Sequence, residues 1–436
     1  MKKASVIFLA IIMAACVLSL GNFDAAGGDI RTASLNETAA APQPVPYKYL
    51  RKYTGLGETA QSVGYEFNPA YDYNAGIRAI EYKSISYLGL QTRVFAYLGF
   101  PSGADAAHKV PAVVLVHGAG GTAFPAWVKL WTDRGYAAIA IDTEGRRPDK
   151  TKGGLNGPQN DYMFRTETKP LDEQWMYHAV AAAINAHTLL INDERVDAAN
   201  TGIVGVSWGS VVTGITIGVD GRFKFAVPIY GSGFLDESLS GFTQSYDISE
   251  TGFAWWNPSN YYQNYNAAVL YINSDHDGYF SPNITSKSHN ALAGSHLSYI
   301  AVHTHGETEA EAIPDTYQFA DEIVFGKRIR AAVGPLTRGR DDWYDAEFSI
   351  PEGAEIVDIA AFSKRKPLEY TLENGWQYVI NEDFEEVNPV IKLDTVRGAI
   401  SIRTPWVCRI LYINIVTEKD GVRATESSPL CFGVDK

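Results

Sequence analysis

Six apolar runs without polar alternation constrain the fold of this 436-residue chain more than any other feature. A strand with one face in water alternates polar and apolar residues, whereas a strand covered on both faces does not, and covered strands are typical of parallel sheets. The runs occupy residues 110–116, 136–141, 201–206, 223–230, 267–273 and 297–302. The sequence therefore predicts a mostly parallel sheet with helices on both faces.

Helix signals lie between these runs. The segment 124–134 closes on Gly135, a residue that commonly ends helices. A second helix is expected to begin near Pro170, since proline suits a first helical turn. Its apolar face would carry Met176, Val180, Ile184 and Ile191. This alternation predicts a doubly wound α/β sheet over residues 47–330, with antiparallel strands at its start, in residues 77–100.

The chain changes character after residue 326. Short strand-like runs follow one another, separated by turn residues and with no helix signal between them. They occupy residues 346–350, 378–380, 399–402 and 409–413. The pattern predicts a C-terminal β-sandwich domain over residues 334–436.

The N-terminus has the features of a secretory signal. Lys2 and Lys3 precede an apolar run over residues 4–20, so we expect a signal peptide at residues 1–21, with lipidation of Cys16 as the alternative. Residues 22–46 are rich in Ala, Gly, Pro and Thr and are expected to form a flexible tether. The predicted location is therefore secreted or periplasmic.

Charge and cysteine content limit the partners and the covalent framework. The formal net charge is −13, which disfavours nucleic acid and anionic membrane surfaces as partners. No run after the signal is long enough to be expected to span a membrane. Cys408 and Cys431 could form one disulfide in an exported protein or remain two free thiols, and the sequence leaves both open. The oligomeric state is also left open.

The run at 201–206 leads into Gly205-Val206-Ser207-Trp208-Gly209, a G-x-S-x-G pattern. At a sharp turn from a buried strand into a helix, this pattern lifts the serine oxygen out of the sheet, where a base can reach it. A side chain at either glycine would clash with the neighbouring strand or helix. The pattern predicts that Ser207 is a nucleophile.

A glycine-rich segment follows the run at 110–116. It reads His117-Gly118-Ala119-Gly120-Gly121. Glycines after a strand let backbone N–H groups face a pocket, where they stabilise the oxyanion of a tetrahedral intermediate. We expect the donors to be the backbones of Ala119 and of Trp208, which follows the nucleophile. His117 itself is expected to be structural.

A serine nucleophile needs a base, and the base needs an acid that orients it. The acid is expected after the run at 267–273, where Asp277 is preferred and Asp275 is the alternative. The base is expected after the run at 297–302, where His305 is preferred because Gly306 lets the loop bend, and His303 is the alternative. A metal site built from these histidines and Asp277 lacks a supporting motif, so no metal or organic cofactor is expected.

With these residues placed, residues 77–327 resemble the dienelactone-hydrolase-like and acetyl xylan esterase branches of the α/β-hydrolase superfamily. The resemblance is carried by the segments at 117–121, 205–209, 256–261 and 277–282 and by His305-Gly306. It implies ester hydrolysis, often the removal of acetyl groups from plant polysaccharides, with no cofactor. A peptidase of the prolyl oligopeptidase type is the alternative enzyme, disfavoured because no propeller-sized segment precedes the sheet. A non-catalytic carbohydrate-binding or scaffold protein is the alternative outside enzymes.

Residues 231–265 are predicted to form an aromatic-rich insertion before the strand at 267–273, which the predicted acid follows. Aromatic rings suit stacking on sugar faces, so Trp255 and Trp256 are candidates for substrate contact, with packing of the insertion as the competing interpretation. Glu144, Arg146 and Arg147 follow a strand at the same edge of the sheet. Of these three we select Glu144 as a substrate-binding residue. The expected substrate is a small-molecule or polysaccharide ester.

Overall fold

The computed structural model describes residues 42–55, 63–160, 169–240, 248–300, 305–373 and 377–433. The predicted signal peptide, Cys16 and the tether up to residue 41 lie outside the described residues, and so does His303. Within the described part of the chain, no helix is long and apolar enough to cross a membrane.

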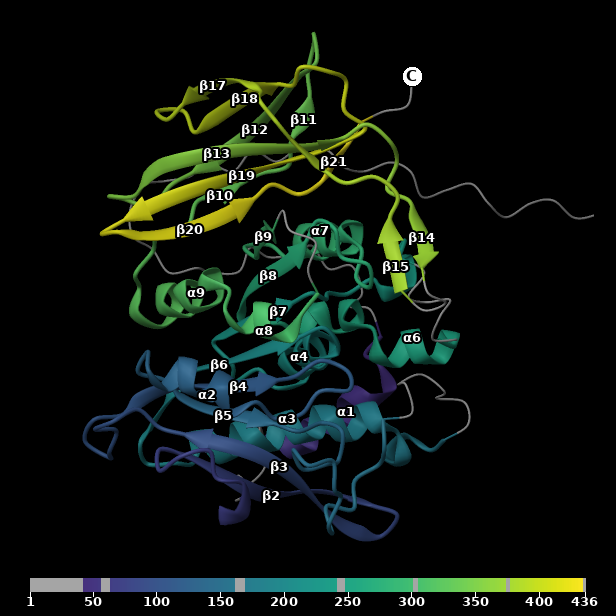
Figure 1. The fold of residues 1–436 in the computed structure, drawn as a ribbon, viewed down its shortest axis with the longest axis vertical. Helices are drawn as coiled ribbons and strands as arrows, with labels where there is room; N and C mark the ends of the chain where they lie inside the picture. The colour runs from purple at the N-terminus through teal and green to yellow at the C-terminus, as the bar shows by residue number, and fades with distance from the viewer. Residues whose placement is uncertain are drawn as a thin grey trace, which may run out of the picture. The chain divides into compact units, whose positions relative to one another are not determined.

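A nine-stranded sheet forms the centre of the fold, in the order β1-β2-β3-β5-β4-β6-β7-β8-β9 (Figure 1). The strands are β1 Tyr65–Phe67, β2 Ile77–Tyr87, β3 Leu90–Gly99, β4 Val110–Val116, β5 Ala137–Ile141, β6 Val196–Val206, β7 Phe225–Ile229, β8 Ala268–Ser274 and β9 His296–Ile300. β1 to β3 pair antiparallel, and β3 joins β5 antiparallel. From β5 to β9 every pairing is parallel. The predicted doubly wound α/β sheet is confirmed.

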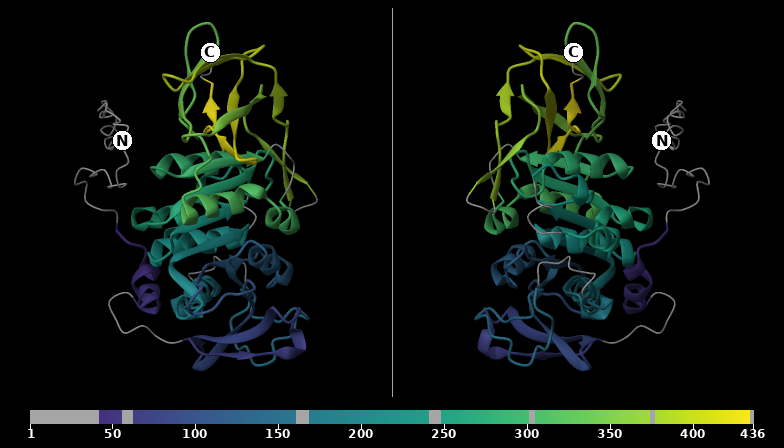
Figure 2. Two further views of the ribbon diagram at one scale, coloured as in Figure 1. Left: turned by 90° about the vertical axis from the view of Figure 1, so that its left-hand side faces the viewer. Right: turned by 90° about the vertical axis from the view of Figure 1, so that its right-hand side faces the viewer.

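Helices cover both faces of this sheet (Figure 2). The helices are α1 Val45–Arg51, α2 Pro125–Thr132, α3 Trp175–Ile191, α4 Trp208–Val219, α6 Glu250–Trp256, α7 Pro282–Ala291, α8 Glu307–Glu311 and α9 Pro314–Phe325. Side chains of α3, α4 and α7 belong to one apolar cluster, and those of α2 and α9 belong to a second. Along β4, Val114 joins the first cluster whereas Val113 and Leu115 join the second. The unalternating runs therefore arise because both faces of each strand are buried.

The helix predicted to start near Pro170 starts later. A 3₁₀ turn, Leu171–Glu173, comes first, and α3 begins at Trp175. The helix is also buried on all sides from Trp175 to Leu190, not along one face only. It packs against the sheet and also contacts α1 and α4, which explains why a one-sided apolar pattern describes it poorly.

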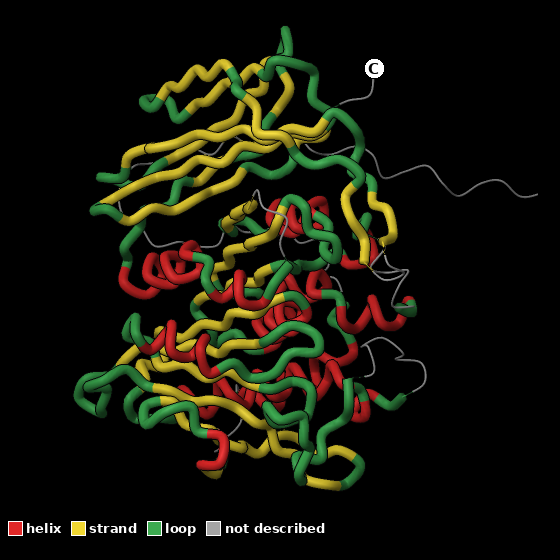
Figure 3. The backbone as a smooth tube through the Cα atoms, viewed as in Figure 1, coloured by secondary structure: helices red, strands yellow, loops and turns green. Residues whose placement is uncertain are grey.

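The chain after α9 contains only strands and loops among its described residues (Figure 3). One sheet joins β10 Ala332–Val333, β12 Trp343–Ser349, β18 Ala399–Arg403 and β17 Val390–Asp394, with β11 Thr337–Arg338 on β12. A second joins β16 Glu385–Val387, β13 Glu355–Lys364, β19 Ile410–Lys419 and β20 Val422–Ser427, with β21 Cys431–Phe432 on β19. Apolar residues of both sheets share one core, which confirms the predicted β-sandwich. Cys408 and Cys431 are free thiols.

The β-sandwich also packs on the nine-stranded sheet. β20 contacts β9, and the rings of Tyr299 on β9 and Tyr412 on β19 lie 5.1 Å apart between centroids. A separate hairpin, β14 Tyr370–Glu373 with β15 Gln377–Ile380, contributes Tyr370 and Ile380 to the same apolar cluster as α3 and α4. Residues Pro42–Lys436 accordingly form one compact unit.

Candidate active site

Ser207 lies at the turn from β6 into α4. Its φ is 54° and its ψ is −118°, a conformation that non-glycine residues rarely adopt. A Cβ on Gly205 would lie 2.1 Å from the carbonyl oxygen of Gly209, and a Cβ on Gly209 would lie 2.1 Å from that of Val116. The steric reason predicted for both glycines is confirmed. The strained turn presents the serine hydroxyl at the carboxyl edge of the sheet.

The structure brings His305 and Asp277 to this serine. Nε2 of His305 lies 2.9 Å from Oγ of Ser207, and Nδ1 of His305 lies 2.7 Å from Oδ2 of Asp277. Because an ionised carboxylate only accepts, Nδ1 carries the ring proton, and Nε2 is left to accept the serine hydroxyl. Three residues far apart in sequence thus form one hydrogen-bonded relay.

Asp277 is held firmly in the loop after β8. The residue is 1% exposed, and Oδ1 accepts hydrogen bonds from the backbone N–H groups of Tyr279 and Phe280 at 2.7 and 2.8 Å. The aromatic rings of these two residues also pack beside His305, at centroid distances of 4.5 and 6.1 Å. Both oxygens of the carboxylate are therefore satisfied, which fixes the orientation of the imidazole.

Asp275, the alternative acid, points elsewhere. Its Oδ2 accepts a hydrogen bond of 2.6 Å from the hydroxyl of Tyr412, and its Oδ1 contacts the ring of its neighbour His276. The hydroxyl of Tyr370 donates to the backbone oxygen of Asp277 at 3.0 Å. The acid loop is therefore held from the C-terminal part of the chain, through Tyr370 and Tyr412. Sequence reasoning missed these two residues because hydrogen bonds between distant segments leave no local pattern.

The segment 117–121, here called the oxyanion loop, has backbone N–H groups with and without a hydrogen-bond acceptor. The N–H of Gly118 donates to Oε2 of Glu307 at 3.0 Å, and the N–H of Gly120 donates to Oε1 of Glu144 at 3.0 Å. Within the described residues, the N–H of Ala119 has no acceptor, and the residue is exposed. Trp208 begins α4, where the backbone N–H groups point out of the helix. This geometry is compatible with the predicted oxyanion donors.

His117 supports this loop. The N–H of Thr143 donates to Nε2 of His117 at 3.0 Å, so Nδ1 carries the proton and donates to the oxygen of Gly118 at 2.6 Å. The ring is 2% exposed. His117 therefore stabilises the oxyanion loop through hydrogen bonds of its buried ring, in keeping with the structural role expected for it.

Glu307 is a second residue that sequence reasoning missed. It joins the loop that carries His305 to the oxyanion loop through the bond to Gly118, while its Oε1 is buried and has no partner among the described residues. Burial raises the pKa of this carboxyl. An acidic residue in a first helical turn is common, so the sequence carries no signal that separates Glu307 from an ordinary helix start.

Glu311, one turn further along α8, is expected to make stability depend on pH. Burial, and then the charge of Glu307, raises the pKa of Glu311 to about 8, whereas a glutamate in an unfolded chain titrates near about 4.3. Because the pKa is raised on folding, the stabilisation is fully present below about pH 4 and is lost as the pH rises through about 8. Glu311→Gln should therefore flatten the fall of Tm between pH 5 and pH 9.

The measurement is a series of thermal melts across this pH range. The control is Glu309→Gln, which removes an exposed carboxyl from the same helix and should leave the wild-type curve in place. Other buried carboxyls add to the slope of the wild type, so the difference between the two variants is the quantity of interest. Parallel curves for both variants would show that Glu311 does not titrate in this range.

The predicted substrate-binding residues have different outcomes. Trp256 is 0% exposed, and its Nε1 donates to Oε1 of Gln174 at 2.9 Å, so it is a core residue that substrate cannot reach. The expectation for Trp256 is wrong because its ring packs in the core cluster that the insertion shares with α3 and α4. Trp255 is half-buried against the same cluster, and its role stays a prediction. Glu144 lies beside the oxyanion loop with its carboxylate already hydrogen-bonded to the N–H of Gly120, and its contact with substrate stays a prediction. Arg147 turns away to pair with Glu81 at 2.6 Å.

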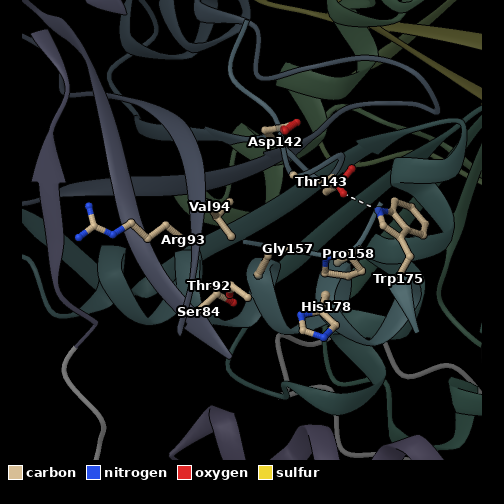
Figure 4. A pocket seen from close by; sticks show the side chains of 13 residues that line it. Ser84, Thr92, Arg93, Val94, Asp142, Thr143, Gly157, Pro158, Trp175 and His178 are labelled. Atoms are coloured by element: carbon tan, nitrogen blue, oxygen red, sulfur yellow. Dashed lines mark hydrogen bonds between the residues drawn. The ribbon is translucent and has the colours of Figure 1, made fainter. Parts of the chain in front are cut away.

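A small cavity of about 30 Å³ is lined in part by the loop that follows β5 (Figure 4). Thr143 and Trp175 border it and are hydrogen-bonded to each other, and His178 closes another side. This volume holds about two water molecules, and none of the three relay residues lines it. The cavity is therefore too small for an ester substrate.

Comparison with protein families adds an independent finding. The model of the prolyl oligopeptidase family matches residues 165–311, a stretch that contains Ser207, Asp277 and His305. Carboxypeptidase S1 homolog B of Arthroderma otae is 32% identical over 98 residues, which is 22% of this chain and 14% of that protein. The match thus spans a small part of the length of that relative.

Solved structures show the fold. Acetyl xylan esterase 1 from Thermoanaerobacterium sp. superposes with a TM-score of 0.50 and 13% identity, over 65% of this chain and 94% of the esterase. An acetyl xylan esterase from Paenibacillus sp. superposes with a TM-score of 0.48 and 17% identity, over 64% and 93% of the two chains. The predicted α/β-hydrolase resemblance is confirmed. The chain has a serine hydrolase fold that esterases and peptidases share.

Proposed function

We propose that this protein is a carboxylic ester hydrolase that acts through an acyl-enzyme on Ser207. The observation that carries the proposal is the relay from Ser207 through His305 to Asp277, with contacts of 2.9 and 2.7 Å. These distances lie within the range that general-base activation of a serine requires. Ser207 also lies next to backbone N–H groups that can stabilise an oxyanion.

The reaction follows from the protonation states. Oγ of Ser207 attacks the ester carbonyl while Nε2 of His305 takes its proton, and Asp277 stabilises the imidazolium that forms. The N–H groups of Ala119 and Trp208 stabilise the negative charge on the carbonyl oxygen. His305 then gives its proton to the departing alcohol and activates the water that releases the acid. No metal and no organic cofactor takes part in this sequence.

We infer that the substrate is an acetylated carbohydrate. The support is the likeness to an acetyl xylan esterase over 94% of the length of that enzyme. The basic and apolar start of the sequence supports export, so we place the protein outside the cytoplasm. A peptidase is the second candidate, because the matched family model is that of the prolyl oligopeptidase family.

Substrate panels separate these candidates. The purified protein should release acetate from 4-nitrophenyl acetate and acetylated xylan and should leave 4-nitroanilide peptides intact. Ser207→Ala prepared in the same way should release no acetate from either ester. Cleavage of the peptide amides at rates similar to the esters would favour the peptidase. A folded protein that cleaves neither class would favour a non-catalytic role.

A further inference from the structure

A polar cavity of about 300 Å³ lies against the oxyanion loop. It is lined by Gly120, Glu144, Arg146, Lys152, Gln159 and Asn160. Gly120 is one residue from Ala119, the proposed oxyanion donor, and the oxyanion loop contacts the nucleophile, since a Cβ on Gly118 would lie 3.1 Å from Cβ of Ser207. A group bound in this cavity would therefore lie beside the ester that Ser207 attacks.

The carboxylate of Glu144, which lines this cavity, already accepts hydrogen bonds on both oxygens. Oε1 of Glu144 accepts from the N–H of Gly120 at 3.0 Å and from Nδ2 of Asn160 at 2.9 Å. Its Oε2 accepts from Nη2 of Arg146 at 3.2 Å. Glu144 is 5% exposed, so it has little capacity left for a ligand. The negative charge of Glu144 neutralises the charge of Arg146, so that Lys152 is the second cation that lines the cavity.

Lys152 is the cation that remains. Within the described residues, no carboxylate lies at ion-pair distance from its ammonium group. Arg146 and Lys152 both line the cavity. Partial burial, and then the nearby charge of Arg146, lowers the pKa of Lys152. An excess positive charge against the oxyanion loop stands out in a chain whose net charge is −13. A lysine that lines a cavity and has no acidic partner among the described residues can donate a charge-assisted hydrogen bond to an anion.

The loop that carries Lys152 is built to hold this position. Arg147 anchors it through an ion pair of 2.6 Å with Glu81 and a hydrogen bond of 3.0 Å to the oxygen of Gly153. The N–H of Leu155 donates to the oxygen of Lys152 at 2.8 Å, and the side chain of Leu155 is 0% exposed. The loop is therefore fixed before a ligand arrives, which lowers the entropic cost of binding.

We propose that this cavity binds the carboxylate of a uronic acid, so that the preferred substrate is an acetylated acidic sugar. The inference rests on the proposed esterase function and names its substrate class. A cavity of about 300 Å³ exceeds what an acetyl group fills, and it lies at the lower limit of pockets that hold a small ligand. At physiological salt, charges further than about 8 Å are largely screened, so a bound group is affected mainly by the cavity itself, where Lys152, Arg146 and Glu144 leave one net positive charge.

The test compares two substrates that differ only in the carboxylate, acetylated methyl glucuronoside and acetylated methyl glucoside, at 0.15 M salt. We expect kcat/KM to favour the glucuronoside by at least about tenfold, the size of one charge-assisted hydrogen bond. Lys152→Ala should abolish this ratio and Lys152→Glu should invert it. The matched control is Lys150→Glu, which makes the same charge change at an exposed residue outside the cavity and should keep the wild-type ratio.

Equal kcat/KM for both sugars in the wild type, or a ratio that survives Lys152→Glu, would overturn the inference while leaving the esterase proposal standing. Binding is a second readout that needs no turnover. Calorimetry on Ser207→Ala should detect methyl glucuronoside but not methyl glucoside, and the added Lys152→Glu change should remove this binding. A protein that binds neither sugar would contradict the assigned ligand even if every ester were hydrolysed.

Discussion

Replacing His305 by alanine should lower kcat for an ester substrate by about four to six orders of magnitude, the range found when a base of a serine hydrolase is removed. The reason is that Nε2 of His305, at 2.9 Å, is the base placed to accept the hydroxyl proton of Ser207. Without it the hydroxyl keeps its proton and is a poor nucleophile at neutral pH. The measurement is kcat on 4-nitrophenyl acetate, with active-site concentration corrected for folded protein.

The control is His303→Ala. This side chain lies outside the described residues and is the alternative base that the sequence left open. We expect it to retain turnover within about tenfold of the wild type, since a residue without a part in proton transfer affects the rate only through local packing. If His303→Ala lost the larger share of kcat and His305→Ala remained active, the base would be reassigned to His303.

Replacing Asp277 by asparagine should lower kcat by about four orders of magnitude while preserving the shape of the site. An asparagine that turned its amide toward the ring would donate a hydrogen bond to Nδ1 of His305, so the ring proton would move to Nε2. In that tautomer the histidine cannot accept the proton of Ser207. KM should change little, because Asp277 is buried and does not touch substrate.

Asp275→Asn is the matched control on the same loop. Asp275 is also buried, yet its carboxylate accepts from Tyr412 and not from His305. We expect this change to lower Tm, because it weakens the contact between the acid loop and β19, and to lower kcat by less than about tenfold. A larger loss of kcat in Asp275→Asn than in Asp277→Asn would exchange the assignment of the acid.

Local sequence patterns predict the parallel strands and the nucleophile turn of this protein. The unalternating apolar runs identify the parallel strands, because burial on both faces removes polar residues from a strand. The glycines around Ser207 identify the nucleophile turn, because their missing side chains are a steric requirement that the sequence records directly. Asp277 and His305 could be selected because each follows a strand at the same edge of the sheet. The strands and the nucleophile turn depend only on residues close together in the chain, whereas the acid and the base also required the order of the strands and left Asp275 and His303 as alternatives.

Contacts between distant segments could not be predicted in this way. Tyr370 and Tyr412 reach the acid loop from the C-terminal part of the chain, and Glu307 reaches Gly118 from the loop that carries His305. Nothing near these residues in the sequence distinguishes them from ordinary strand or helix positions. Trp256 is predicted from the sequence to contact substrate but is buried. The sequence of an insertion does not distinguish an aromatic residue that faces solvent from one that packs in the core.

Covalent labelling of Ser207 tests the central claim most directly. The folded protein is treated with a fluorophosphonate, digested, and searched by mass spectrometry for the modified residue. We predict one adduct, on Ser207, with labelling that is lost in Ser207→Ala and slowed by orders of magnitude in His305→Ala. An adduct on another serine, or no labelling of folded wild-type protein, would contradict it.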